Sequence, residues 1–277
     1  MRAECGIDWL TVTIPLEDTE RPNVVYLGHK LQEKEKKVGN SIKPATIQGY
    51  EGSVCGGVFV GEGLGGAMVR SSGFSANEAF TLLQHTKVKP TRIDLQVTVW
   101  YADNPAEVIR KYAEVAIADS AVADSRTKRK ITTWEGNDGG YTLYIGARSS
   151  DYFGRLYDKH KESKDEEYKN ALRFEVEIKG KRAEQAFDAL SRRNRDRNKA
   201  IVSFVGEWYT GRGVYVPFLY TTGEMELSPI RREKSDTHRR MEWLKTQVRH
   251  TILELRRTVD STVILDALGF FEPLEEE

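Results

Sequence analysis

Apolar and polar residues alternate along several short segments of this chain, which is the pattern of a strand with one covered face. In the segment 91–99 the two kinds of residue alternate strictly from the third position onward. The segment 173–179 repeats this pattern. Looser alternation at 7–14, 141–146 and 153–159 predicts three more strands.

Glycines recur between Gly49 and Gly73, among apolar residues such as Val58 and Val60. This mixture predicts short strands joined by tight turns or bulges, because glycine adopts backbone conformations that other residues avoid. A phosphate-binding loop is the alternative at the run GEGLGG. The sequence argues against it, because the GK[ST] motif of nucleotide-binding loops does not follow that run.

Helical spacing of apolar residues predicts four helices. We expect them over residues 76–86, 104–120, 182–191 and 236–258. Ser75 and Glu78 have the spacing of a capping box at the start of the first, and Pro105 suits the first turn of the second. The last helix is long and highly charged, so it either packs on the main domain with a basic outer face or presents its arginines to a partner.

Together these elements favour an α+β fold built on a largely antiparallel, twisted sheet. A strand with an acidic polar face stands next to a helix twice, at 91–99 and at 172–179, which hints at an internally duplicated unit. We expect helices on one face of the sheet and an open polar face on the other. The predicted domains are a main domain over 1–225 and a C-terminal helical segment over 226–277 with an acidic tail.

The 277 residues include 42 Lys and Arg and 42 Asp and Glu, so the chain carries no net charge. Neutrality argues against a nucleic-acid-binding protein, which usually carries surplus positive charge. The charge is uneven, however, with basic clusters at 126–130 and 192–199 and acid at 165–167 and in the final EPLEEE. Each basic cluster taken alone is more simply a hydrated surface. A neutral total therefore does not exclude DNA, but it predicts weak non-specific affinity.

Cysteine use and hydropathy bear on the compartment. The two cysteines have no CxxC spacing, which excludes a zinc site and favours a reducing environment. No stretch approaches the roughly 20 apolar residues of a membrane helix. We therefore expect a cytoplasmic protein with no membrane partner.

If the predicted strands share one sheet, their polar residues meet on one face. That face gathers three carboxylates, one phenol and four cations: Asp94, Glu175, Glu177, Tyr157, Arg92, Arg155, Lys159 and Arg173. Carboxylates that converge without histidine or cysteine suit a hard divalent ion such as Mg²⁺ or Mn²⁺. A tyrosine beside such an ion can attack a phosphodiester. The alternative is an ordinary strand face lined with cross-strand ion pairs.

Three motifs follow one another along the chain: T-R-I-D at 91–94, R-L-Y-D-K at 155–159 and R-F-E-V-E-I-K at 173–179. In this order they resemble the Rep_trans (replication initiation factor) family. Its members are the tyrosine-dependent rolling-circle initiators of staphylococcal-type plasmids, with related relaxases of conjugative elements and filamentous-phage replication proteins. The resemblance covers about residues 7–220 and is most specific between 91 and 179.

The resemblance implies roles for individual residues. The tyrosine of the family's R-[IL]-Y-[ND]-K motif is the nucleophile, which maps onto Tyr157. The family's T-R-[IL]-D motif supplies a metal-site residue that maps onto Asp94. Its R-[VF]-E-[IV]-E strand maps onto Glu175 and Glu177, of which either or both would hold Mg²⁺ or Mn²⁺. The cations assigned to DNA are Arg92, Lys128, Arg129, Lys130, Arg148, Arg155, Lys159 and Arg173.

Two comparisons with rolling-circle enzymes refine this picture. Plasmid members of the family commonly carry a second aspartate four residues after the first, and Thr98 stands at that position here. The other large class of rolling-circle enzymes binds its metal through two histidines separated by one apolar residue. None of the five histidines forms such a pair, which leaves a carboxylate-bound metal.

The function implied is that of a metal-dependent DNA nicking-closing enzyme, with the polar face of the sheet as its catalytic and DNA-binding face. The helix expected over 236–258 then either packs on the main domain or contacts DNA or a helicase. The enzyme would nick one strand at a double-strand origin through Tyr157, form a 5′-phosphotyrosyl intermediate and later rejoin the ends. Host helicase and polymerase would be partners, and the family suggests a homodimer. Three alternatives stay open: a relaxase for conjugative mobilisation with the same chemistry, a non-catalytic origin-binding regulator, and a sheet that binds a small ligand.

Overall fold

The computed structural model describes residues 2–100, 103–122, 129–193 and 196–214, with 216, 255, 258–260 and 263 as isolated positions. The chain divides into two units, Met1–Ser228 and Pro229–Glu277. All elements described below belong to the first unit. The helix predicted over 236–258 lies almost entirely outside the described residues, as does Lys128.

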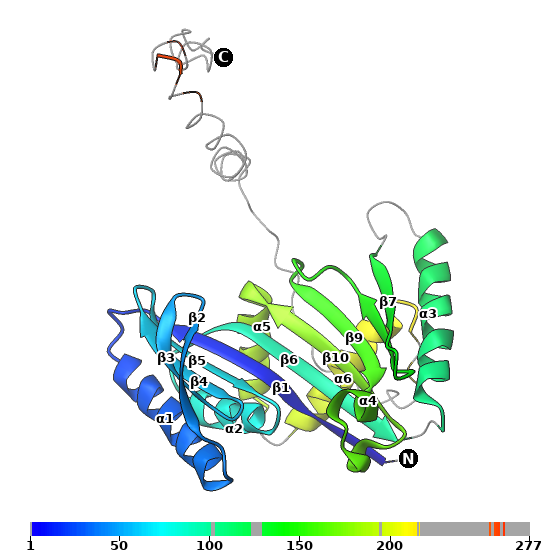
Figure 1. Cartoon of the computed structure of the whole chain (residues 1–277), viewed down its shortest axis with the longest axis horizontal. Coiled ribbons are helices and arrows are strands. Elements are labelled where there is room, and N and C mark those ends of the chain that lie inside the picture. The colour runs from blue at the N-terminus through cyan, green and yellow to red at the C-terminus, as the bar shows by residue number, and fades with distance from the viewer. Residues whose placement is uncertain are drawn as a thin grey trace. The chain divides into compact units, whose positions relative to one another are not determined.

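One antiparallel sheet runs through the whole of the first unit (Figure 1). Its strands, in chain order, are β1 (Arg2–Ile14), β2 (Ile42–Ile47), β3 (Tyr50–Cys55), β4 (Val58–Gly63), β5 (Gly66–Ser72), β6 (Lys89–Trp100), β7 (Ile131–Glu135), β8 (Tyr141–Ile145), β9 (Tyr152–Asp158) and β10 (Ala171–Lys179). In space the order is β2-β3-β4-β5-β1-β6-β10-β9-β8-β7. The predicted α+β class with an antiparallel sheet is confirmed.

Five helices pack on the sheet and bury its apolar residues. They are α1 (Arg21–Lys37), α2 (Phe74–Leu83), α3 (Pro105–Val122), α5 (Gly180–Ser191) and α6 (Arg197–Thr210). Figure 1 shows α1 and α2 beside the half that holds β2–β5, and α3 beside the β7 edge. A short helix, α4 (Lys159–Ser163), and a 3₁₀ turn, η1 (Glu166–Tyr168), follow β9. No helix in the described part of the chain is both long and apolar enough to cross a bilayer.

The strands and the three helices predicted within the described residues are present, but the capping box at Ser75 is wrong. Helix α2 begins two residues earlier than predicted, with Gly73 as its N-cap and no side-chain cap. The Ser75 hydroxyl instead donates to Glu35 of α1, and Glu78 pairs with Lys34 of the same helix. Both side chains therefore join two helices rather than capping one.

The strand order is symmetric about the central pair β1 and β6. In each half, the last strand along the chain pairs with the first strand of that half: β5 pairs with β1, and β10 pairs with β6. Each half also contains a helix after its first strand and another after its last. Whether this plan arose by internal duplication stays a prediction.

The polar face of the sheet is not open to water at its centre. Every residue of β10 from Ala171 to Ile178 is buried, and so is every residue of β6 from Ile93 to Val99. Charged side chains on the face away from the packed helices are thus buried as well. They must be paired, because an isolated charge in such surroundings is strongly destabilising.

Candidate active site

The register of the strands arranges side chains in rows across the polar face. The first row runs through Trp134 (β7), Thr142 (β8), Tyr157 (β9), Arg173 (β10) and Thr98 (β6). The second row lies two residues away from the first on each strand. It runs through Tyr144, Arg155, Glu175 and Gln96. A third row places Glu177 opposite Asp94. The period of two predicted for each strand thus brings the three motifs together on one face.

Tyr157 lies at the centre of this arrangement, with its side chain 8% exposed. Its hydroxyl donates a hydrogen bond to Glu175 Oε2 over 3.0 Å. Burial raises the pKa of Tyr157 well above its usual value, and the charge of Glu175 adds to that rise, whereas Arg173 opposes it. The phenol is therefore protonated and already points its proton at a carboxylate.

Asp94 and Glu177 face each other and share one guanidinium. Arg92 contacts Asp94 through Nε (2.8 Å to Oδ1) and Nη2 (2.5 Å to Oδ2), and its Nη2 lies 2.9 Å from Glu177 Oε2. Lys179 Nζ lies 2.5 Å from the other oxygen of Glu177. Burial raises the pKa of the Asp94 carboxyl to about 7, against the opposing effect of Arg92.

Arg155 bridges the carboxylates of Glu175 and Asp94. Its Nη2 donates to Glu175 Oε1 and lies 3.9 Å from Asp94 Oδ2. Its Nε is buried without a hydrogen-bond partner among the described residues. Burial alone would lower the pKa of Arg155, but Glu175 raises it above its usual value. Of the arginines around the carboxylates, Arg155 is thus the one with unused donor capacity next to Tyr157.

Arg173 is held from several sides and is 4% exposed. Its Nε donates to Thr98 Oγ1 (2.8 Å), its Nη1 to Asp8 Oδ1 (2.9 Å) and its Nη2 to Glu4 Oε1 (3.3 Å). The threonine at the position where plasmid members carry an aspartate therefore anchors this arginine. The charge of Arg173 opposes the rise in the pKa of Tyr157, and its role in DNA binding stays a prediction.

Of the remaining cations predicted to bind DNA, Lys159 borders the groove that Tyr157 lines, whereas Arg148, Arg129 and Lys130 do not line it. Lys159 lines the same groove and pairs with Glu162 over 2.6 Å. Arg148 lies over the ring of Phe153, 5.2 Å from its centroid. Arg129 pairs with Asp119 over 3.3 Å, and Lys130 is exposed just before β7. Their roles stay predictions.

Asp158, which follows the tyrosine in the R-L-Y-D-K motif, is the N-cap of α4. Its Oδ1 accepts a hydrogen bond from the backbone N–H of Lys161 over 3.1 Å. Aspartate and asparagine are among the best N-cap residues. The cap ends β9 directly after Tyr157 and turns the chain so that Lys159 and Lys161 border the same groove.

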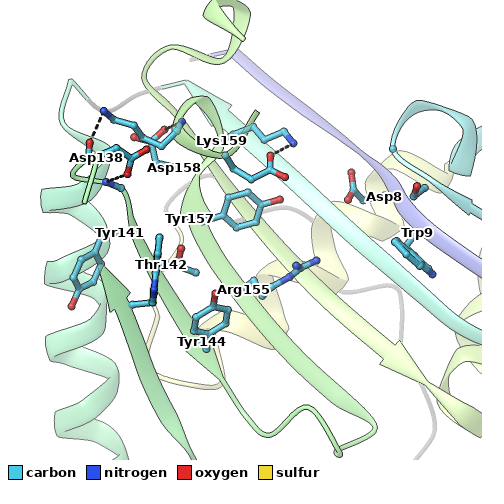
Figure 2. A pocket seen from close by; sticks show the side chains of 16 residues that line it. Asp8, Trp9, Asp138, Tyr141, Thr142, Tyr144, Arg155, Tyr157, Asp158 and Lys159 are labelled. Atoms are coloured by element: carbon cyan, nitrogen blue, oxygen red, sulfur yellow. Dashed lines mark hydrogen bonds and ion pairs between the residues drawn. The ribbon is translucent and has the colours of Figure 1, made fainter. Parts of the chain in front are cut away.

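A groove of about 650 Å³ contains the Tyr157 side chain. Figure 2 shows Tyr157 and Arg155 on β9, with Thr142 and Tyr144 on one side and Asp8 and Trp9 on the other. Trp134 also lines it. Sequence reasoning missed Trp9, Trp134 and Tyr144 as site residues. Of these three, only Tyr144 could have been identified from the sequence. It lies on the predicted strand 141–146, and the alternation of that strand puts its side chain on the polar face.

The carboxylates have the right chemistry for a hard cation, but they are already engaged. Among the described residues, no three carboxylate, thiol or imidazole side chains are arranged around one point as metal ligands. Arg155 occupies the place between Asp94 and Glu175, and Arg92 the place between Asp94 and Glu177. Oxygen donors on neighbouring strands fit Mg²⁺ or Mn²⁺, provided that a guanidinium moves aside.

Comparison with known proteins places this geometry in a family. Among solved structures, the chain is similar to the rolling circle replication initiator protein from Geobacillus stearothermophilus, with 20% identity, a TM-score of 0.53, and coverage of 84% of this chain and 91% of that chain. At this identity the likeness shows the fold alone. No curated protein matches the sequence. The family described as replication initiation factor (Rep_trans) matches residues 88–267, which is more than half of the chain and includes all three motifs. The chain therefore belongs to the replication initiation factor family.

Proposed function

We propose that this protein starts rolling-circle replication by nicking one strand at a double-strand origin, with Tyr157 as the nucleophile. The observation that carries the proposal is the 3.0 Å hydrogen bond from the Tyr157 hydroxyl to Glu175 Oε2. A phenol with a raised pKa is a weak nucleophile unless a base accepts its proton as it attacks. The hydrogen bond from Tyr157 supports Glu175 as that base.

In the nicking step the Tyr157 oxygen attacks the phosphorus of the scissile phosphodiester and its proton passes to Glu175. The bond from phosphorus to the 3′ oxygen breaks, and that oxygen takes a proton from solvent. The 5′ phosphate stays on the tyrosine, and the free 3′-OH is the end that a host polymerase would extend behind a helicase. Attack of a 3′-OH on the phosphotyrosine reverses the step, which rejoins the ends and returns the proton to Tyr157.

Arg155 is the cation best placed to contact the phosphate. It lies directly opposite Glu175 in the register and two residues before Tyr157, and its Nε is unpartnered within the described structure. A guanidinium binds phosphate through two donors at once. Movement of Arg155 onto the phosphate would also free Glu175 Oε1, whereas Asp94 Oδ2 would keep its 2.5 Å contact with Arg92 Nη2.

Asp94, Glu175 and Glu177 would hold Mg²⁺ or Mn²⁺ in this proposal, and such an ion supplies neutralisation of charge on the phosphoryl oxygens. Glu175 has an oxygen for each task, because Oε2 faces Tyr157 and Oε1 faces Arg155. Lys159, Arg148, Arg129 and Lys130, with Lys128, would hold the flanking phosphates of origin DNA.

The test is a supercoiled plasmid that carries the cognate origin, incubated with the protein and Mg²⁺ or Mn²⁺. The wild-type protein should relax it and stay attached to a 5′ end, and mass spectrometry should find the DNA on Tyr157. Tyr157→Phe should abolish both the nick and the adduct while leaving origin binding intact. Nicking by Tyr157→Phe at the wild-type rate would refute the proposal.

One observation favours a rival function, an origin-binding regulator without chemistry. All three carboxylates are neutralised by Arg92, Arg155 and Lys179, as they would be in a purely structural ion-pair network. The same assay separates the two. Salt-sensitive origin binding with no covalent adduct in either metal would support the regulator.

A further inference from the structure

An exposed tryptophan lies in the same row of the sheet as the proposed nucleophile. Trp134 is on β7, the edge strand, and is 56% exposed. It pairs in register with Thr142 of β8, which pairs with Tyr157 of β9. Two strand spacings separate Trp134 from Tyr157, which amounts to roughly 10 Å. That distance lets one nucleotide reach both side chains.

The space between the indole and the phenol is open. Thr142, the residue between them, is small, and Trp134, Thr142 and Tyr157 all line the groove of about 650 Å³. The indole is bent over the β7–β8 turn, where a β-carbon on Gly136 would overlap it. The glycine thus lets the ring lie against the backbone while more than half of the residue faces solvent.

The charges around the groove suit a phosphodiester chain. Lys159, Lys161 and Arg155 border it. Its acidic residues are already engaged: Asp8 with Arg173 (2.9 Å), Asp138 with Lys164 (2.6 Å), Glu162 with Lys159 (2.6 Å) and Asp158 as the cap of α4. A strand entering the groove would therefore meet carboxylates that are already engaged, an aromatic face, and Lys161, whose Nζ donates to the backbone oxygen of Asp138. To bind Lys159 or Arg155, its phosphates would displace Glu162 or Glu175.

We propose that Trp134 stacks on an unpaired base next to the phosphate that Tyr157 attacks. This inference rests on the proposed function and adds a base-binding subsite to it. The ligand is single-stranded DNA, because a base must leave the duplex to expose its face to an indole. Stacking of this kind tolerates any base, so Trp134 holds the strand at the nick rather than reading the origin sequence.

The experiment separates base stacking from phosphate binding. Fluorescence anisotropy at low salt with EDTA compares two labelled probes, a 12-nucleotide oligothymidylate and an abasic 12-mer with the same phosphates. We expect Trp134→Ala to weaken oligothymidylate binding on the order of tenfold and to leave abasic binding unchanged. Trp134→Phe should retain most of the affinity, because a phenyl ring still stacks.

Tyr26→Ala is the matched control, since Tyr26 on α1 is also 56% exposed. It should change neither affinity. Equal weakening for both probes in Trp134→Ala, or none for either, would overturn the inference. Cleavage plays no part in this assay. If Trp134→Ala binds oligothymidylate as tightly as the wild type while the wild-type protein nicks through Tyr157, only the base-binding subsite is overturned. If Tyr157→Phe nicks at the wild-type rate, only the proposed function is overturned.

Discussion

The two halves of the sheet share one plan but differ in the charges on their polar face. The first half runs from β1 to α2 and the second from β6 to α6, and in each the last strand returns to pair with the first. In the first half Arg70 lies over Trp9, with 4.6 Å between guanidinium and ring centroid. In the second half the arginines lie against buried carboxylates.

The arginine pKa values express this difference. Burial, followed by the charge of Arg92, lowers the pKa of Arg70. Burial acts in the same direction on Arg92 and Arg155, yet the carboxylates of Asp94 and Glu175 raise their pKa values above the usual one. The two halves therefore share a scaffold, and of these three arginines only the two in the second half lie against buried carboxylates.

The largest expected effect comes from removing one charge from the second half. Glu175→Gln keeps an oxygen near Tyr157 but cannot take its proton, so the nicking rate on the origin plasmid should fall by about 10²- to 10⁴-fold. Glu62→Gln is the control in the first half, because Glu62 on β4 also pairs with an arginine, Arg21, over 2.8 Å. The control should nick normally. Wild-type rates in Glu175→Gln would exclude Glu175 as the proton acceptor.

A second effect tests how the covering helices hold β9, the strand that carries Tyr157. Gly154 on β9 faces away from the groove, and a β-carbon there would overlap the indole of Trp208 on α6. Overpacking of a filled core is destabilising, so Gly154→Ala should lower the free energy of unfolding by about 3 kcal/mol in urea titrations. Tyr209 of α6 lies at the same point and donates to the backbone carbonyl of Arg155 over 2.6 Å.

Gly65→Ala in the first half is the control for Gly154→Ala. Gly65 is exposed, and its β-carbon would meet only the hydroxyl of Tyr50, which can move aside. Its unfolding free energy should stay within about 0.5 kcal/mol of the wild-type value. Equal effects at both glycines would mean that the contact between α6 and β9 is not tightly packed.

The strands of the site could be predicted because their residues alternate strictly. In β6 and β10 the apolar positions lie on the helix side, which puts Asp94, Glu175 and Glu177 on the other side. Periodicity does not reveal the pairing of each carboxylate with an arginine, because pairing depends on register between strands far apart in sequence. The site was therefore predicted as a set of residues, without its ion pairs.

Elements with weak or interrupted periodicity were missed. Helix α1 buries Gly28 and Gln32 beside Val24 and Leu31, so its buried face does not read as an apolar stripe. Gly28 is buried because its missing side chain lets α1 approach Val60. The first turn of α6 lies within the basic cluster 192–199, whose charges give no apolar stripe.

Strand β7 gave no signal for a different physical reason. Four of its five residues are exposed and the fifth is half-buried, so it has no covered face and is held by pairing with β8. Trp134 was overlooked with it. An edge strand of this kind can be recognised only once its partner strand is known.

The smallest expected effect compares two buried threonines, one in each half. Thr98 accepts a hydrogen bond from Arg173 Nε (2.8 Å), and Thr11 accepts one from Trp9 Nε1 (2.9 Å). Thr98→Val leaves a charged donor buried without that partner and should cost about 1.5 kcal/mol of unfolding free energy. Thr11→Val removes a neutral bond from a half-buried indole and should cost about 0.5 kcal/mol. Urea titrations of both variants measure the difference, and equal losses would show that Arg173 does not depend on Thr98 for its place beside Tyr157.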